Sequence, residues 1–383
     1  MTALFLISAQ TSDRSPTGSS RIAFPWEIDP PPQSLVPLDE IRSGGPPPDG
    51  IPPIDEPKFE SVDEAEAWLD DREPVLSLVR DEAARAYPLQ ILTWHEIVND
   101  TFAGDPITVT YCPLCNSGIA FHRRSEPTGA ARSLLGAKDP VVLDFGTSGR
   151  LYRSNLVMYD RQTKSLWIQF TGQAVTGPFM GAELETIPSQ MVSWAEFREA
   201  HADASVLSRD TGHRRDYGRN PYAGYDDVGS TPFLFDGEHD GRLDPMERVV
   251  TVSVDGASRA YRYRSMNEMA QHGAAVISDV LADTPIAIFY RFGTTSALDA
   301  SEIAASKDVG AAGVFDARIA GRRLTFEPSP EGFRDNQTGS TWNLLGEAVS
   351  GELEGSRLEA VVHDDTFWFV WSTFRPQTTI WKG

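Results

Sequence analysis

Gln162-Thr-Lys-Ser-Leu-Trp167 and Gln337-Thr-Gly-Ser-Thr-Trp342 decide the fold, because they are two versions of one pattern. Gly172-Gln-Ala-Val-Thr-Gly177 follows the first, and Gly346-Glu-Ala-Val-Ser-Gly351 follows the second. The order and the spacing of these segments agree to within one residue, which chance would rarely produce. Self-similarity of this kind predicts that the chain is an internal duplication.

Further matches extend the pattern in both directions. Arg85-Ala-Tyr87 recurs as Arg259-Ala-Tyr261, and each follows a segment of alternating apolar and polar residues that is typical of a strand. Trp194-Ala-Glu-Phe197 and Trp371-Ser-Thr-Phe374 close the two copies. Because short alternating strands outnumber helical segments, we predict a β-rich α+β fold of two similar halves. Their pseudo-two-fold arrangement would leave a cleft between them for a ligand.

The matches divide the chain into four predicted parts. Residues 1–58 are rich in proline, which disfavours helix interiors and central strands, and form an extended or disordered arm with a mobile tail at Met1 to Ala9. The first repeat spans 59–208 and opens with the capping box Ser61-Val-Asp-Glu64. Residues 209–247 form a polar, aromatic linker or lid, and 248–383 form the second repeat, which has no cysteines.

The composition excludes several classes of protein. With 34 Lys and Arg against 55 Asp and Glu, the net charge is −21, which would repel nucleic acid and anionic membranes. No apolar run is long enough to span a membrane, so we expect a soluble protein. Two cysteines are too few for a secreted disulfide scaffold. We expect a cytoplasmic location, or export if the printed start truncates a signal peptide.

The two cysteines lie where the copies differ. Cys112-Pro-Leu-Cys115 follows a predicted strand, and the second copy has Arg291 and Thr294 at the equivalent positions. Thiolates three residues apart on a turn can converge on one metal ion, and Asn116 can take the left-handed conformation that ends such a turn. Arg291 would either face an anionic substrate group or form a salt bridge.

Histidine would have to complete a metal site, because the chain has no further cysteine. His95 stands in Thr93-Trp-His-Glu96, a segment that predicts a capping box at the start of a helix, with Glu96 as a cap. A position at a helix start would keep the imidazole neutral and able to bind metal. His122 is the other nearby imidazole. We therefore predict Cys112, Cys115 and His95 as metal ligands and catalytic residues.

The leading hypothesis is a metal-dependent enzyme of the oxidoreductase type that acts on an unidentified small molecule. Copper(I), zinc and iron all suit two thiolates and an imidazole. A non-catalytic metal-binding or carrier protein would use the same residues. A metal-free dithiol redox protein would use the cysteines alone. Two buried cysteines without function are the remaining alternative.

Three separated motifs resemble one known family. They are Tyr87 to Asp100, Thr110 to Cys115 and Met158 to Thr163, in that order. With them the chain resembles a family of bacterial and archaeal proteins known as domain of unknown function DUF3179, over most of residues 70–383. The resemblance implies a shared fold and places His95 and Cys112 within matching motifs, and it implies little about the chemistry.

Overall fold

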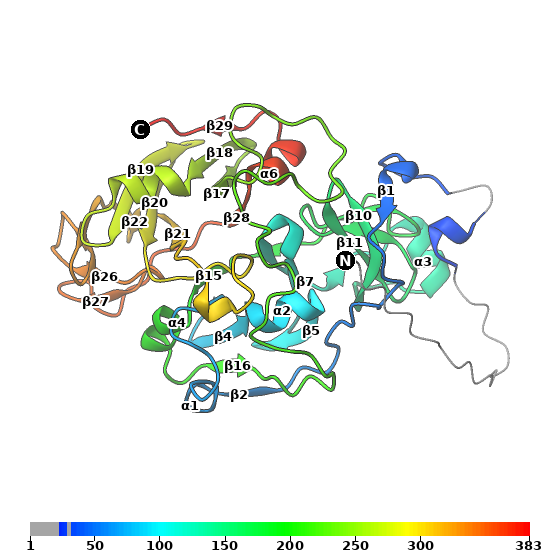
Figure 1. Ribbon diagram of the computed structural model, residues 1–383, viewed down its shortest axis with the longest axis horizontal. Coiled ribbons are helices and arrows are strands. Elements are labelled where there is room, and N and C mark those ends of the chain that lie inside the picture. Colours follow the sequence, from blue (N-terminus) through cyan, green and yellow to red (C-terminus); the bar gives the residue numbers. More distant parts are fainter. Residues whose placement is uncertain (1–22, 29–31) are drawn as a thin grey trace.

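The computed structural model describes residues 23–28 and 32–383, so the predicted tail at Met1 to Ala9 lies outside the described residues. The fold is rich in β-structure, as predicted, with short helices between the strands. For description, the N-terminal half is residues 59–208, the linker is 209–247 and the C-terminal half is 248–383. Figure 1 shows β19, β20 and β27 at one end of the molecule and β1, β10 and α3 at the other.

The N-terminal half contains three main sheets, one of which also includes strand β1 from the arm, and a two-stranded ribbon. In order of hydrogen bonding, their strands are β15 (Gln190–Ser193), β3 (Pro74–Arg80), β4 (Ala83–Pro88), β16 (Ser205–Leu207) and β2 (Phe59–Ser61); β14 (Thr186–Ile187), β7 (Ser117–His122), β6 (Asp105–Cys112) and β5 (Ile97–Phe102); β1 (Ile41–Ser43), β10 (Phe145–Tyr152), β11 (Asn155–Asp160), β12 (Leu166–Ile168) and β13 (Gln173–Thr176); and β8 (Arg124–Ser125) with β9 (Val141–Val142).

The C-terminal half also contains three main sheets and a ribbon. Their strands are β28 (His363–Phe367), β17 (Arg248–Val254), β18 (Ala257–Arg262) and β29 (Thr379–Ile380); β19 (Ala274–Leu281), β20 (Thr284–Arg291) and β21 (Ala311–Asp316); β24 (Phe326–Ser329), β25 (Gly332–Asp335), β26 (Thr341–Trp342) and β27 (Ala348–Ser350); and β22 (Arg318–Ile319) with β23 (Arg322–Arg323).

Short helices connect the sheets. The α-helices are α1 (Val62–Ala65), α2 (Leu89–His95), α3 (Gly129–Leu135), α4 (Trp194–Ala200), α5 (Tyr263–Met269) and α6 (Trp368–Phe374), and the 3-10 helices are η1 (Pro25–Glu27), η2 (Leu38–Glu40), η3 (Pro113–Cys115) and η4 (Ile303–Ala305). The predicted capping box is present at α1, where the Ser61 hydroxyl accepts from the Glu64 amide and the Glu64 carboxylate accepts from the Ser61 amide.

Strand pairing follows the same order in both halves. β3 pairs antiparallel with β4 and β15, and β4 pairs parallel with β16. β17 pairs antiparallel with β18 and β28, and β18 pairs parallel with β29. In each half the register shifts at the tryptophan of the quoted motif, between Leu166 and Trp167 and between Thr341 and Trp342.

The polar contacts at the Arg-Ala-Tyr motifs also correspond. The arginine and the tyrosine of Arg85-Ala-Tyr87 both donate to Asp100 on β5. Those of Arg259-Ala-Tyr261 both donate to Asp279 on β19. Each carboxylate thereby ties the first hairpin of its half to the strand that follows the helix, and buried tyrosine hydroxyls find the partners they require.

The halves pack against each other through a shared core. β28 lies beside β7, and β15 lies beside β21, so each half places a strand against the other. One hydrophobic cluster joins Val192 and Trp194 of the N-terminal half to Phe289 and Trp342 of the C-terminal half. Burial of this much aromatic surface favours a fixed arrangement of the halves. Within the described residues, no helix combines the length and the apolar character needed to span a membrane.

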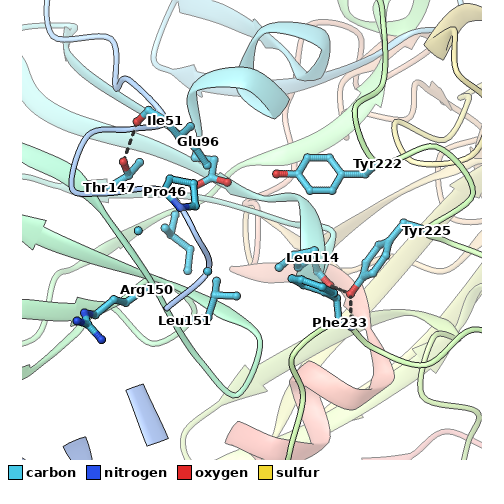
Figure 2. Close-up of a pocket in the computed structure, with 13 residues that line it drawn as sticks. Pro46, Ile51, Glu96, Leu114, Thr147, Arg150, Leu151, Tyr222, Tyr225 and Phe233 are labelled. Atoms are coloured by element: carbon cyan, nitrogen blue, oxygen red, sulfur yellow. Dashed lines mark hydrogen bonds between the residues drawn. The ribbon is translucent and has the colours of Figure 1, made fainter. Parts of the chain in front are cut away.

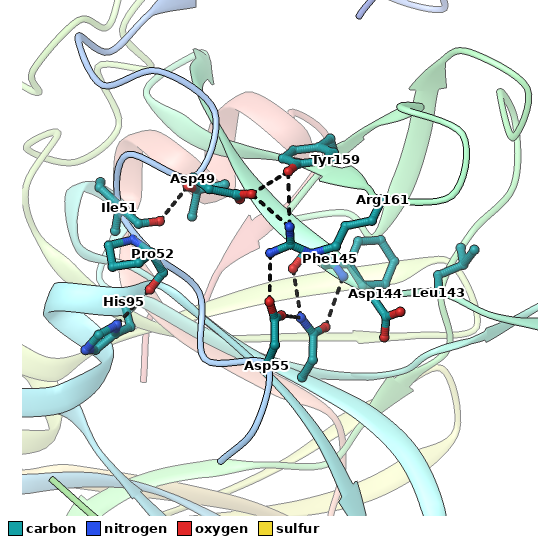
Figure 3. A network of polar contacts seen from close by, with 12 residues as sticks. Asp49, Ile51, Pro52, Asp55, His95, Leu143, Asp144, Phe145, Tyr159 and Arg161 are labelled. Carbon is teal, nitrogen blue, oxygen red and sulfur yellow. Dashed lines mark hydrogen bonds and ion pairs between the residues drawn. The ribbon is translucent and has the colours of Figure 1, made fainter. Parts of the chain in front are cut away.

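The described part of the proline-rich arm packs along the N-terminal half (Figure 3). Asp49 accepts hydrogen bonds from the Tyr159 hydroxyl (2.6 Å) and Arg161 (2.9 Å). Asp55 accepts from Arg161 (2.9 Å) and from the side chain of Asn99 (2.7 Å). These contacts fix the arm across β5 and β11, and they bring its backbone close to α2.

Candidate functional site

The turn that carries both cysteines lies between β6 and β7, as predicted. Pro113, Leu114 and Cys115 form the single 3-10 turn η3, and Asn116 ends it with φ 50° and ψ 41°. Asparagine tolerates this left-handed conformation better than most residues, so the prediction for Asn116 is confirmed. The Asn116 amide group donates to the Asp365 carbonyl (3.4 Å), and the Thr366 hydroxyl donates to the Cys115 carbonyl (2.9 Å). β28 of the C-terminal half therefore supports the turn.

The two thiols lie side by side in a buried place. Their Sγ atoms are 2.9 Å apart, and Cys112 and Cys115 are 1% and 0% exposed. The Asn155 side chain donates to the Cys115 Sγ (3.3 Å), and the Ser154 carbonyl lies 3.6 Å from that atom. Burial raises the pKa of the Cys115 thiol well above its usual range, and the adjacent Cys112 thiol raises it further. At neutral pH Cys115 is therefore held as a thiol.

His95 is placed differently from the prediction. Helix α2 has Pro88 as its N-cap and ends at His95, and the Thr93 hydroxyl donates to the Leu89 carbonyl inside the helix (2.6 Å). The predicted capping box at Thr93 to Glu96 is therefore wrong, because the helix begins four residues earlier than that hydroxyl.

Both ring nitrogens of His95 are engaged. The Pro52 carbonyl can only accept, so Nδ1 carries the proton and donates to it (2.7 Å). The Tyr217 hydroxyl of the linker then donates to Nε2 (2.7 Å) and contacts the Thr211 hydroxyl (2.6 Å). Burial lowers the pKa of His95 to about 4, so the imidazole is neutral. His95 joins the arm, α2 and the linker.

The predicted three-ligand metal site can be tested against these contacts. The described residues contain no group of three or more His, Cys, Asp or Glu side chains placed to hold a metal ion. His95 has no free lone pair for a metal, because Nε2 already accepts from Tyr217. Two sulfurs that share a tetrahedral zinc ion lie about 3.8 Å apart, which is wider than the separation found here. The set Cys112, Cys115 and His95 therefore does not fit a metal centre in this arrangement.

The other imidazole considered from the sequence lies at the opposite end of β7 from the thiol turn. His122 is the last residue of β7 and pairs across the sheet with Ile107, whereas the thiol turn precedes the first residue of that strand. Arg291 forms the salt bridge that the sequence offered as one alternative, with its Nε 3.5 Å from a Glu196 carboxylate oxygen.

Glu96 is the residue that sequence reasoning misjudged. It follows α2 in a left-handed conformation (φ 59°), which is uncommon for a residue with a long side chain. Its carboxyl group is buried, and burial raises its pKa to about 8. Among the described residues, no side chain or backbone group forms a hydrogen bond with the Glu96 carboxyl group. Backbone strain together with a buried, unpaired carboxyl group is characteristic of functional sites.

The Glu96 carboxyl group points into a pocket of about 300 Å³ beside the thiol turn (Figure 2). The arm, the N-terminal half and the linker all contribute to its walls, and no residue of the C-terminal half does. The pocket is therefore not the predicted cleft between the halves. Its apolar lining residues include Pro46, Ile51, Leu114, Leu151, Leu156 and Phe233.

The linker covers this pocket with aromatic side chains. The Tyr222 hydroxyl points toward Glu96 across the pocket (Figure 2). The Tyr225 hydroxyl donates to the Leu114 carbonyl (3.1 Å) and accepts from the Phe233 amide (3.2 Å). Leu114 lies between the two cysteines, so the linker, the pocket and the thiol turn meet at this residue. The aromatic composition of the linker was the sequence signal for this covering role.

Comparison with known proteins identifies the family. No curated protein and no solved structure matches the chain. The family described as Protein of unknown function (DUF3179) matches residues 48–378, which include Ile51 of the arm, the N-terminal half, the linker and most of the C-terminal half. The chain therefore belongs to the DUF3179 family.

Proposed function

We propose that this chain is a metal-free dithiol redox protein of the oxidoreductase type, in which Cys112 and Cys115 interconvert between two thiols and a disulfide. The observation that supports this function best is the 2.9 Å separation of the two Sγ atoms on a rigid turn. The chain has no third cysteine, so each thiol has the other as its resolving partner.

The chemistry is thiol–disulfide exchange with a disulfide of a small molecule or another protein. One thiolate attacks the partner disulfide and releases one partner thiol. The second cysteine then attacks the mixed disulfide and releases the other thiol. In balance, two cysteine thiols and one partner disulfide give the Cys112–Cys115 disulfide and two partner thiols. The proposed pair transfers two electrons and two protons in each cycle.

Burial controls the rate of this exchange. The thiolate is the attacking form, and the raised pKa of Cys115 keeps its fraction small at neutral pH. A partner must also reach a pair that is almost fully covered, so Leu114 and the linker residue Tyr225 above it have to move. This requirement gives the predicted lid role of residues 209–247 a specific function.

A metal-dependent enzyme and a metal carrier remain predictions from the sequence. Cys112 and Cys115 would supply two ligands in either case, with copper, zinc or iron as the ion. The arrangement of His95 supports the dithiol function better, because its Nε2 is occupied by Tyr217.

We also propose that the two halves arose by internal duplication and that redox chemistry belongs to the N-terminal copy alone. The matching strand pairing, the two Arg-Ala-Tyr contacts with aspartate and the reciprocal packing of β28 on β7 and β15 on β21 support this origin. Under this proposal the site arose by divergence at the turn where Cys112 corresponds to Arg291.

A redox titration tests the proposed function. The folded protein is equilibrated without oxygen in mixtures of reduced and oxidised dithiothreitol, then denatured and alkylated, and the labels are counted from the intact mass. The expected result is a reversible two-electron transition between two labels and none. Cys112→Ser should carry one label at every ratio.

Two results would contradict the proposal. Two labels at every ratio would show that the pair does not form a disulfide. Near-stoichiometric copper, zinc or iron in protein purified without an affinity tag, lost in Cys112→Ser, would favour the metal-dependent alternatives instead.

A further inference from the structure

The Glu96 pocket has a polar end and an apolar body. Pro46, Ile51, Leu151 and Leu156 form much of the apolar part, which suits a ring or a short hydrocarbon chain. A volume of about 300 Å³ is at the small end of the range for ligand pockets, so it suits a molecule with about one ring.

Most polar groups around the pocket already have partners. The Tyr225 hydroxyl is occupied by the Leu114 carbonyl and the Phe233 amide. The Thr147 hydroxyl donates to the Ile51 carbonyl (2.7 Å). The Arg150 guanidinium turns away from Glu96, lies 4.1 Å from the ring centre of Trp26 and donates to the arm backbone (Figure 2).

Glu96 and Tyr222 provide the groups that remain for a ligand. The carboxyl group of Glu96 and the hydroxyl of Tyr222 face each other across the pocket, and neither forms a hydrogen bond with the described residues. Buried polar groups in proteins are nearly always paired, so an unpaired carboxyl group directed into a cavity indicates a ligand that pairs with it.

The charge of the ligand follows from this arrangement. In the empty pocket burial raises the pKa of Glu96 to about 8, and a cation bound beside it favours the ionised form. The resulting carboxylate and the phenol oxygen of Tyr222 can both accept hydrogen bonds, and the carboxylate attracts a positive charge in an apolar setting. The net charge of −21 raises the local concentration of cations at the surface and disfavours anions. A protonated amine supplies both the charge and several N–H donors.

We propose that this pocket binds a small amine with an apolar body, whose ammonium group lies between Glu96 and Tyr222. This binding site goes beyond the proposed redox function and does not depend on it. The linker closes over the ligand through Tyr222 and Phe233, and the Tyr225 contact with Leu114 places the bound amine next to the thiol turn.

Calorimetric titration with three probes tests the site. The probes are 2-phenylethylamine, the neutral 2-phenylethanol and the anionic 3-phenylpropionate, measured on the full chain with both cysteines kept reduced. The amine should bind at least about tenfold more tightly than the alcohol, as expected for one charge-assisted contact, and the anion should bind most weakly.

Variants locate the binding. Glu96→Gln should raise the dissociation constant of the amine about tenfold or more and change that of the alcohol by no more than about twofold. Glu331→Gln, at an exposed position, should change neither dissociation constant. Tyr222→Phe removes only the hydroxyl and should raise the dissociation constant of the amine about threefold. This second variant tests the site even if Glu96→Gln does not fold.

Three results would overturn the assignment: no binding of the amine, equal or tighter binding of the alcohol, or amine binding that neither Glu96→Gln nor Tyr222→Phe weakens. Because the thiols stay reduced throughout, these results are independent of the redox titration.

Discussion

The turn after β6 and the turn after β20 occupy equivalent places in the two halves, yet they differ in chemistry. The first buries two adjacent thiols, and the unpaired carboxyl group of Glu96 lies nearby. The second carries Arg291, which is partly exposed and paired with Glu196. In the matched motifs Asp160 and Asp335 each accept hydrogen bonds from a tryptophan and a threonine. The N-terminal half differs in carrying two adjacent thiols on its turn and an unpaired carboxyl group after α2. This difference separates the scaffold from the site.

The largest expected effect is a loss of stability on changing the aspartates of the two matched tryptophan motifs. Asp160 accepts from the indole N–H of Trp167 and from the amide and hydroxyl of Thr163, and Asp335 accepts from Trp342 and Thr338 in the same way. Replacing either aspartate by alanine leaves several buried donors unpaired. We expect each change to lower the free energy of unfolding by about 3–5 kcal/mol, measured by urea denaturation.

The corresponding asparagine variants serve as controls, because they keep one acceptor oxygen and should lose less stability. If Asp160→Ala were costly and Asp335→Ala neutral, the equivalence of the two turns would be disproved.

The next effect concerns the unpaired carboxyl group of Glu96. With a pKa of about 8 in the folded protein, it holds its proton between about pH 4.5 and 8, while the unfolded chain ionises. Its contribution to stability therefore falls as the pH rises through this range. Glu96→Gln should gain about 2 kcal/mol over the natural protein at pH 9, and much less at pH 5.

Denaturation curves of both proteins at the two pH values measure this gain. A difference that stays constant with pH would show that Glu96 is not the titrating group.

A smaller effect is expected at the contact between the linker and α2. Tyr217→Phe removes the hydrogen bond to His95 Nε2 and the contact with the Thr211 hydroxyl. We expect a loss of about 1 kcal/mol in global stability. Faster amide hydrogen exchange should be confined to residues 209–247 and the end of α2. Exchange unchanged in the linker would mean that this contact does not hold it.

The smallest effect is expected at the counterpart of Cys112. Arg291 is partly exposed, and its pair with Glu196 has a separation of 3.5 Å. Partly exposed ion pairs contribute little, so Arg291→Ala should change the free energy of unfolding by about 0.5 kcal/mol or less. It should also leave thiol oxidation unchanged. A large loss of stability, or a large change in thiol oxidation, would show that the turn after β20 contributes to the fold or to the redox site, contrary to this comparison.

Much of the fold could be predicted from the sequence, because paired motifs and alternating strands are local signals. The strands around Ile107 to Tyr111 and Ile286 to Tyr290 are present, and so is the left-handed turn at Asn116. The start of α2 was misjudged because Thr93 and Glu96 have the spacing of a capping box, while Pro88 caps the helix without a side-chain hydrogen bond.

The pocket could not be predicted, since its walls come from segments far apart in the chain. No local pattern places Tyr222 of the linker opposite Glu96, or Pro52 of the arm against His95. The two cysteines stood out because the segment compared with theirs has Arg291 and Thr294 instead. The role of Glu96 was hidden because its spacing from Thr93 suggested a helix cap.

The most direct test of the central claim is the mass of the peptide that contains Cys112 and Cys115, after exposure of the folded protein to oxidised glutathione. We expect a peptide lighter by two hydrogen atoms, without a glutathione adduct, because the second thiol resolves the mixed disulfide. A peptide that keeps both thiols in the folded protein, and reacts only after unfolding, would contradict a redox role for the pair.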